Sequence, residues 1–109
     1  MNEKMEKLRE EIIELFKSYD LYLHCSIFCN GNKYSYYKDS LESVTECDVW
    51  QYIDYYNEDT LSMSFDGDIY DVFNYGLFPK LLEKFDSLLR SYGLYYELGN
   101  AWNLSLYEI

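Results

Sequence analysis

The dipeptide Asn30-Gly31 is the feature that most restricts how this chain can fold. A type I′ turn needs positive φ angles at both central residues, and Asn-Gly adopts them readily. In the preceding residues 21–29, Leu, Ile and Cys at the odd positions alternate with Tyr, His, Ser and Phe at the even positions. This period of two predicts a strand. A two-residue loop then brings the apolar residues of two antiparallel strands onto one face, in the pairs Ile27–Tyr34 and Cys25–Tyr36.

Two helices and three further strands follow from periodicity. Apolar residues recur at helical spacing in residues 3–19 and again in residues 79–92. Pro79 suits the first turn of the second helix, and Gly93 suits its end. Alternation predicts strands at residues 60–65, 94–98 and 102–106, with a turn at Gly99-Asn100. We expect one α+β domain, residues 1–109, with a mostly antiparallel sheet of four to six strands and both helices on one face.

Two segments leave alternatives open. Residues 43–46 match a capping box, and the apolar residues of 44–56 suit one face of a helix, although its aromatic and β-branched residues also suit a strand. We favour the helix at 44–56. Residues 68–75 are predicted as a short helix that Asp68 caps and Gly76 ends, with a hairpin as the alternative.

Charge is distributed very unevenly along the chain. Residues 39–79 hold ten Asp and Glu and no Lys or Arg, whereas the rest of the chain holds ten acidic and nine basic residues. Almost all of the formal net charge of −11 therefore lies in that stretch. Aromatic and aliphatic residues are interspersed among its acids, so the carboxylates should lie on the outside of folded elements. The negative charge argues against direct binding to nucleic acid or anionic lipid, which both need Lys and Arg.

A fixed acidic surface is suited to a basic partner. We expect a protein-binding domain that occupies a basic site on another protein, and the sharper hypothesis is a mimic of nucleic acid. Duplex DNA carries about one charge per 1.7 Å of its axis, which an array of carboxylates can imitate in the cleft of a nucleic-acid-binding enzyme. The candidate partner-binding residues are Glu46, Asp48, Asp54, Tyr55, Glu58, Asp59, Asp66, Asp68 and Asp71.

In size, charge and amino-acid composition the chain resembles small phage and plasmid inhibitors of restriction and CRISPR systems, including anti-CRISPR proteins. No motif residue aligns with them, so the resemblance assigns no site. The alternative function is a non-enzymatic interaction or immunity-type module, with a dimer as one form, that uses Tyr-rich sheet surface. Where two tyrosines are adjacent in a strand, one ring should enter the core and the other should face outward, in the pairs Tyr36-Tyr37, Tyr55-Tyr56 and Tyr95-Tyr96.

Few residues suit catalysis or metal binding. His24 is the single histidine and alternates with Cys25 and Cys29, which are expected to be buried as small apolar residues. A zinc site lacks its second pair of ligands, and residues 66–71 depart from a calcium loop at two positions. We therefore expect no enzyme, metal or cofactor, and the least favoured function is a small enzyme that uses carboxylates and tyrosines as acids and bases.

The sequence also bears on location. Three cysteines form no closed disulfide framework, which is typical of a reducing compartment. There is no run of eighteen apolar residues and no apolar signal segment near the start of the chain. We expect a cytoplasmic protein without membrane association.

Overall fold

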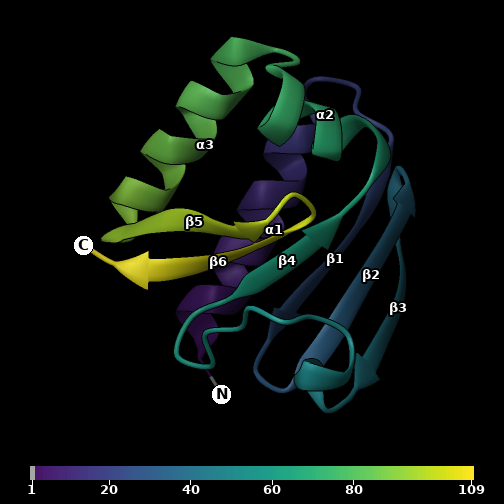
Figure 1. Cartoon of the computed structure of the whole chain (residues 1–109), viewed down its shortest axis with the longest axis vertical. Coiled ribbons are helices and arrows are strands. Elements are labelled where there is room, and N and C mark those ends of the chain that lie inside the picture. The colour runs from purple at the N-terminus through teal and green to yellow at the C-terminus, as the bar shows by residue number, and fades with distance from the viewer. Residues whose placement is uncertain (1) are drawn as a thin grey trace.

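The computed structural model describes residues 2–109, which form three α-helices, six strands and one 3₁₀ turn (Figure 1). In chain order the elements are α1 (Glu3–Lys17), β1 (Leu23–Cys29), β2 (Asn32–Lys38), β3 (Ser40–Glu46), η1 (Val49–Gln51), β4 (Ser62–Phe65), α2 (Gly67–Tyr75), α3 (Pro79–Ser91), β5 (Leu94–Asn100) and β6 (Asn103–Glu108). The strands form one antiparallel sheet in the order β3-β2-β1-β4-β6-β5. The predicted α+β class is confirmed.

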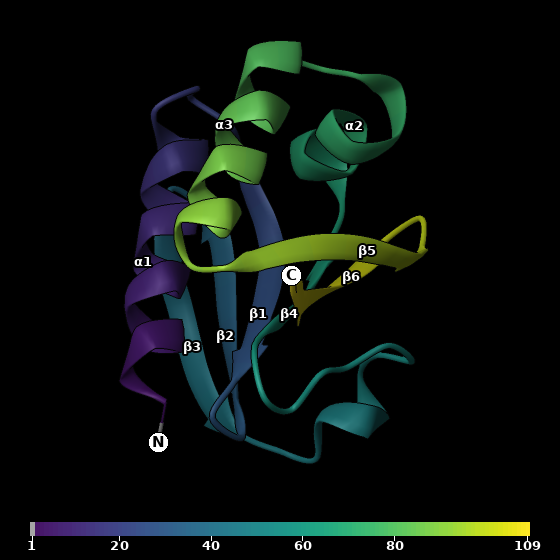
Figure 2. The ribbon, with the colours of Figure 1, turned by 90° about the vertical axis from the view of Figure 1, so that its left-hand side faces the viewer.

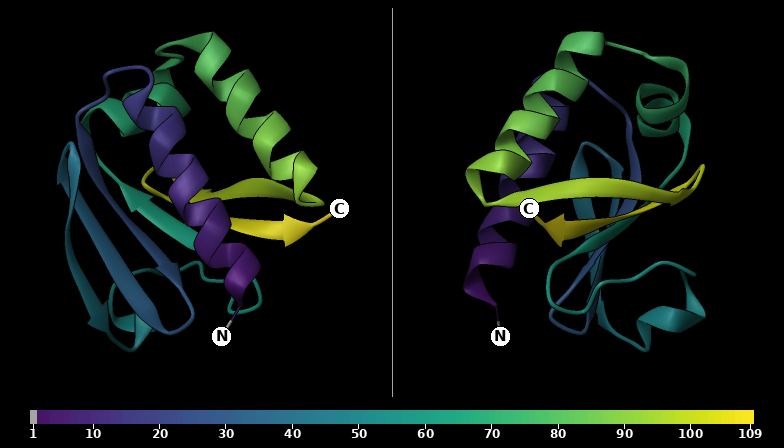
Figure 3. Two further views of the ribbon diagram at one scale, coloured as in Figure 1. Left: turned by 180° about the vertical axis from the view of Figure 1, so that it is seen from behind. Right: turned by 60° about the vertical axis from the view of Figure 1, so that its left-hand side comes forward.

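The main core lies between the sheet and two helices on the same face. α1 and α3 run side by side across this face (Figures 2 and 3). The ring of Phe16 in α1 stacks on that of Phe85 in α3, with centroids 5.9 Å apart. β1 contributes Leu23 and Ile27, both fully buried. Burial of each such side chain contributes about 1.5–3 kcal/mol to stability. Most of the buried apolar residues belong to the core on this face.

The first hairpin has the predicted register. Asn30 and Gly31 adopt φ angles of 54° and 77°, which are the positive values that a type I′ turn requires. The sheet pairs Ile27 with Tyr34 and Cys25 with Tyr36, as expected. Cys25 is buried and His24, on the opposite face, is exposed, which confirms the alternation along β1.

The helix favoured for residues 44–56 is wrong. Residues 40–46 form the edge strand β3, and beyond it only η1 is helical in this segment. Lys38, with a φ angle of 59°, and Asp39 make a tight turn, so that Ser40 pairs with Tyr37 and the chain returns along β2. Pairing with β2 gives the backbone of this segment its hydrogen bonds, and this non-local ladder outweighs a local capping pattern.

The second hairpin turns two residues later than predicted. Its turn is at residues 101–102, where the Asn100 side chain accepts a hydrogen bond from the Trp102 backbone amide (3.0 Å). Gly99 instead lies within β5 at a register shift. The ring of Tyr55 covers it so closely that a Cβ there would be 2.0 Å from a ring atom. Gly99 is therefore needed for close packing and not for the turn.

The predicted cap of α2 is also corrected. Asp66 is the N-cap residue, and its carboxylate accepts from the Gly67 amide (2.9 Å). The Asp68 carboxylate accepts from the Tyr22 amide (2.9 Å), which ties α2 to the chain entering β1. Gly76 ends α2 in the left-handed conformation, as predicted.

The tyrosine pairs follow the predicted alternation only where they lie in strands. Tyr36 is buried and Tyr37 is exposed. In β5, Tyr96 packs against the rings of Phe73 and Phe85 in the main core. The ring of Tyr95 lies near that of Tyr107 on the opposite face of the sheet. The pair at 55–56 lies outside any strand, so the strand rule does not apply there.

A polar cluster lies where α1 crosses the first hairpin. The guanidinium of the buried Arg9 lies 3.9 Å from the ring centroid of Tyr34 and donates to the Tyr36 hydroxyl (2.6 Å). The Glu6 carboxylate accepts hydrogen bonds from four side chains, those of Tyr34, Cys29 (3.1 Å), Asn30 (2.8 Å) and Arg9 (3.5 Å). Burial alone would raise the pKa of Glu6, but these donors and the charge of Arg9 hold that pKa below its usual value.

Glu6→Gln should destabilise the fold by about 1–3 kcal/mol near neutral pH, because several partly buried donors lose a charged acceptor. The lowered pKa makes ionised Glu6 stabilising above its unfolded pKa, and this stabilisation is lost as the pH falls through the folded value. Urea unfolding followed from neutral to acidic pH should therefore show a shallower loss of stability for Glu6→Gln than for the wild type.

The control is Glu14→Gln, which removes an exposed carboxylate from the same helix. This variant should keep the wild-type dependence on pH. An unchanged acid dependence in Glu6→Gln would show that the cluster does not act through the Glu6 charge.

Candidate protein-binding face

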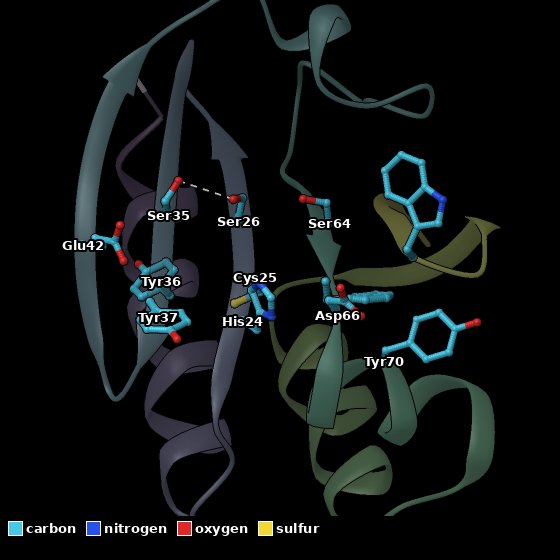
Figure 4. Close-up of a pocket in the computed structure, with 12 residues that line it drawn as sticks. His24, Cys25, Ser26, Ser35, Tyr36, Tyr37, Glu42, Ser64, Asp66 and Tyr70 are labelled. Carbon is cyan, nitrogen blue, oxygen red and sulfur yellow. Dashed lines mark hydrogen bonds between the residues drawn. The ribbon is translucent and has the colours of Figure 1, made fainter.

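The second face of the sheet is only partly covered (Figure 2). Residues 47–60, which follow β3 and include η1, lie over one end of it, and α2 lies at the other end. Between them the surface is hollowed over a volume of about 550 Å³ (Figure 4). We call the face that carries this hollow the open face.

Phe28 fixes residues 47–60 on the open face. It is fully buried although it lies on the opposite side of β1 from the main core. Val49 and Ile53 pack over it and form a second, smaller core. The ring of Tyr52 lies 6.2 Å from that of Phe28, and the amine of Lys33 lies 4.4 Å from the Tyr52 ring centroid. A segment without regular strands is thereby held in place by apolar burial.

Buried polar groups of β6 hold the end of the same segment. The fully buried Asn103 side chain accepts from the Tyr55 amide (3.0 Å) and donates to the Tyr55 carbonyl (3.1 Å). The Ser105 hydroxyl donates to the same carbonyl (2.8 Å). Because buried polar atoms need partners, these bonds make the position of Tyr55 specific.

Small polar side chains form the floor of the hollow. Ser35, Ser26 and Ser64 lie side by side on β2, β1 and β4 (Figure 4). The hydroxyl oxygens of Ser26 and Ser35 are 3.4 Å apart. The rim carries aromatic, imidazole and carboxylate groups, from His24, Tyr37, Glu42, Asp66, Tyr70 and Trp102. Glu42 and Asp66 carry the formal charges of this lining, and both are negative.

A β-bulge directs Glu42 to the hollow. Ser43 pairs with Ser35 and Leu41 pairs with Tyr36, so Glu42 is the extra residue of β3. Asp66 is placed on the other side of β1, where its amide donates to the His24 carbonyl (2.9 Å). Figure 4 shows the two carboxylates near opposite ends of the serine row, Glu42 beyond Ser35 and Asp66 on the Ser64 side.

The predicted partner-binding residues fall into three places. Glu46 ends β3, and three positions lie around the start of α2, namely Asp66, Asp68 and Asp71. The others lie in residues 47–60 and are exposed, namely Asp48, Asp54, Tyr55, Glu58 and Asp59. Of all nine, Asp66 lines the hollow, whereas Asp68 and Asp71 are half-buried.

The prediction omitted several residues of the hollow. Glu42 belongs to the acidic stretch, but only the bulge in β3 brings it to the rim. Tyr70 and Trp102 come from α2 and the β5–β6 turn, and no local pattern relates them. The available signal was that Ser26 and Ser35 each lie between two apolar or aromatic neighbours, which points the serines to the face opposite the main core.

The two sides of the molecule differ in charge. α1 holds five acidic and four basic residues, and α3 holds two acidic and three basic residues. The two helices together are therefore neutral. Residues 39–79, which contain the elements from β3 to α2 around the open face, hold ten acids and no base. Eight of these ten carboxylates belong to exposed residues.

The two buried cysteines of β1 are poor nucleophiles. Burial raises the pKa of the Cys25 thiol to about 12 and also raises that of Cys29, so neither is a ready nucleophile. Within residues 2–109 there is no cluster of three His, Cys, Asp or Glu arranged to hold a metal ion. In the same part of the chain, no helix has the length and apolar content to cross a membrane. No family model, curated protein or solved structure matches the chain.

Asn103→Ala should release the end of the covering segment at Tyr55. The variant loses a buried acceptor and donor, which costs about 1–3 kcal/mol, and the Tyr55 amide should exchange its hydrogen faster. Hydrogen exchange followed by NMR measures this. Asn74→Ala removes side-chain bonds to the Tyr70 and Ala101 carbonyls and should leave Tyr55 protected; equal protection of Tyr55 in both variants would rule out the Asn103 anchor.

Proposed function

We propose that this protein is a small acidic binding protein, acting in the cytoplasm, whose open face engages a basic site on another protein. One observation carries the proposal. Residues 39–79, which contain the elements from β3 to α2 around the open face, carry ten carboxylates and no Lys or Arg, while the helical side is neutral. Charge separated in this way orients the molecule toward a basic surface and raises the association rate.

The sharper form of the proposal is a nucleic-acid mimic that blocks an enzyme of a restriction or CRISPR system. A mimic must present its charges in fixed positions, since ordering a flexible acidic loop would reduce the affinity. The anchors at Phe28 and Asn103 support this form, because they hold the acidic residues 47–60 against the sheet. Direct binding of nucleic acid is not proposed, since the same charges would repel phosphates.

The test compares two variants that have the same formal net charge of −1. The face variant reverses to Lys the exposed acids Glu46, Asp48, Asp54, Glu58 and Asp59. The control variant reverses to Lys five exposed acids outside the open face, Glu3, Glu10, Glu14, Glu83 and Glu108. Displacement of labelled duplex DNA is measured on a panel of CRISPR effector nucleases and restriction endonucleases.

The wild type should displace DNA from its target at low salt and lose potency as salt is added. The face variant should be weaker by about tenfold or more, because exposed ion pairs contribute about 0.2–1 kcal/mol each. The control variant should stay close to the wild type. Equal losses in both variants, or inhibition that salt does not change, would refute the proposal.

A second candidate, self-association, is favoured by the open edge of the sheet. β3 is the last strand, and all seven of its residues are exposed, including the apolar Leu41 and Val44. The Cys47 amide donates to the Gly31 carbonyl (3.1 Å), so by alternation the backbone groups of Val44 and Glu46 point away from β2. Such an edge pairs readily with another strand.

Val44→Pro tests this candidate, because it removes an outward N–H without touching the ladder to β2. If β3 pairs with a second copy, light scattering should show a dimer that becomes stronger with salt, since two acidic edges repel each other. Val44→Pro should abolish the dimer and the matched Val44→Thr should retain it. A monomer at every concentration and salt would eliminate this candidate. If instead the protein binds another protein and added salt weakens that binding, the result supports a basic partner.

A further inference from the structure

We propose that the hollow on the open face is a binding site for arginine side chains of an extended segment of the partner. This inference rests on the proposed function and names the chemistry by which the partner is recognised. Three independent features of the hollow support it: its charge, its aromatic rim and its polar floor.

The charge of the hollow selects a cation. Glu42 and Asp66 are the two carboxylates among its twelve lining residues, and no Lys or Arg is among them. Lys33, which lies two residues before Ser35 on β2, is held over the ring of Tyr52. A concave surface with charge of one sign strengthens the attraction of the opposite charge.

The spacing of the carboxylates suits an extended segment. Glu42 lies on β3 and Asp66 follows β4, and these strands are three places apart in the sheet. At about 4.8 Å between neighbouring strands the separation is about 14 Å. Four residues of extended chain span about 13 Å and return the side chain to the same side. Two cationic side chains, four residues apart, therefore match the two carboxylates.

The aromatic rim favours arginine over lysine. Tyr37 and Trp102 line the hollow and keep more than a third of their surface exposed. Trp102 is held at the rim because its carbonyl accepts from the Phe65 amide (2.9 Å). A guanidinium stacks on such rings and binds a carboxylate with two parallel hydrogen bonds, whereas an ammonium is a compact and strongly hydrated charge.

The floor supplies further acceptors. The hydroxyls of Ser26, Ser35 and Ser64 form a row along the hollow, next to the two carboxylates (Figure 4). A hydroxyl oxygen accepts hydrogen bonds from N–H groups, and a guanidinium has five of them. Because serine side chains are small, the surface is recessed where they lie, between the larger aromatic side chains of the rim.

The chain itself contains an arginine bound by the same kinds of group. The Arg9 guanidinium lies over the ring of Tyr34, donates to the hydroxyl of Tyr36 and pairs with Glu6 (3.5 Å). An aromatic face, a hydroxyl and a carboxylate thus suffice to hold a guanidinium in this fold. The hollow offers this combination with the guanidinium to be supplied from outside.

The experiment uses the full chain with Trp50→Phe, so that Trp102 is the remaining tryptophan. Two peptides serve as probes, Gly-Arg-Ser-Gly-Ser-Arg-Gly and the same peptide with Lys in place of both Arg. The fluorescence of Trp102 is followed at low salt. The Arg peptide should change it saturably and bind about threefold or more tightly than the Lys peptide, a difference typical of stacking on an exposed ring.

Two variants compare a carboxylate of the hollow with one outside it. Glu42→Gln should weaken the binding of the Arg peptide by about two- to fivefold. Glu58→Gln, an exposed acid of residues 47–60, should change its affinity less. Backbone amide NMR shifts on titration should be largest at Ser26, Ser35 and Ser64, and both variants should keep the wild-type spectrum elsewhere.

Equal affinities for the two peptides, together with equal effects of Glu42→Gln and Glu58→Gln, would overturn the site and leave only diffuse attraction. NMR shifts confined to residues 47–60 would overturn it as well, while still agreeing with an acidic binding face. No binding of either peptide would also overturn the arginine site. The proposed function is judged separately by the DNA-displacement comparison, so either proposal can fail alone.

Discussion

The burial of Phe28 on the side opposite the helices is the contact on which the open face depends. An antiparallel sheet needs cover on one face only, and α1 and α3 supply it. Phe28 adds a second apolar site, and Val49 and Ile53 close over it. Residues 47–60 are thereby held across one end of the open face instead of extending into solvent (Figure 2). Without this small core the acidic residues of the segment would have no fixed positions.

Charge and packing are arranged on different sides of the molecule. The neutral helical side buries the large apolar surface, including the stacked rings of Phe16 and Phe85. The acidic side buries a smaller apolar cluster around Phe28 and also holds its shape through polar contacts, such as those of Asn103 with Tyr55. The self-repulsion of ten carboxylates is tolerated because stability comes mainly from the other side. Such a division suits a protein whose charged face must meet a partner.

The success of sequence-based prediction varied with the range of the interactions involved. The first hairpin was predicted in register because Asn30-Gly31 determines its own turn geometry. The segment 44–56 was predicted wrongly because its conformation depends on pairing with β2, which a local capping pattern does not report. The role of Gly99 was also predicted wrongly. A glycine is needed there because the ring of Tyr55, more than forty residues away along the chain, leaves no room for a side chain. Local signals were reliable where no distant partner competed with them.

The sequence by itself determined the α+β class, the two main helices, the first hairpin and the separation of charge, because these follow from periodicity, turn chemistry and residue type. Tertiary structure alone decided the hollow. β4 lies between β1 and β6 in the sheet, and that order brings Ser64 beside Ser26 and Trp102 to the rim. The bulge that directs Glu42 to the hollow depends on the register of β3 against β2. The order of the strands and the bulge in β3 are set by the packing of the whole chain, so no local pattern encodes them.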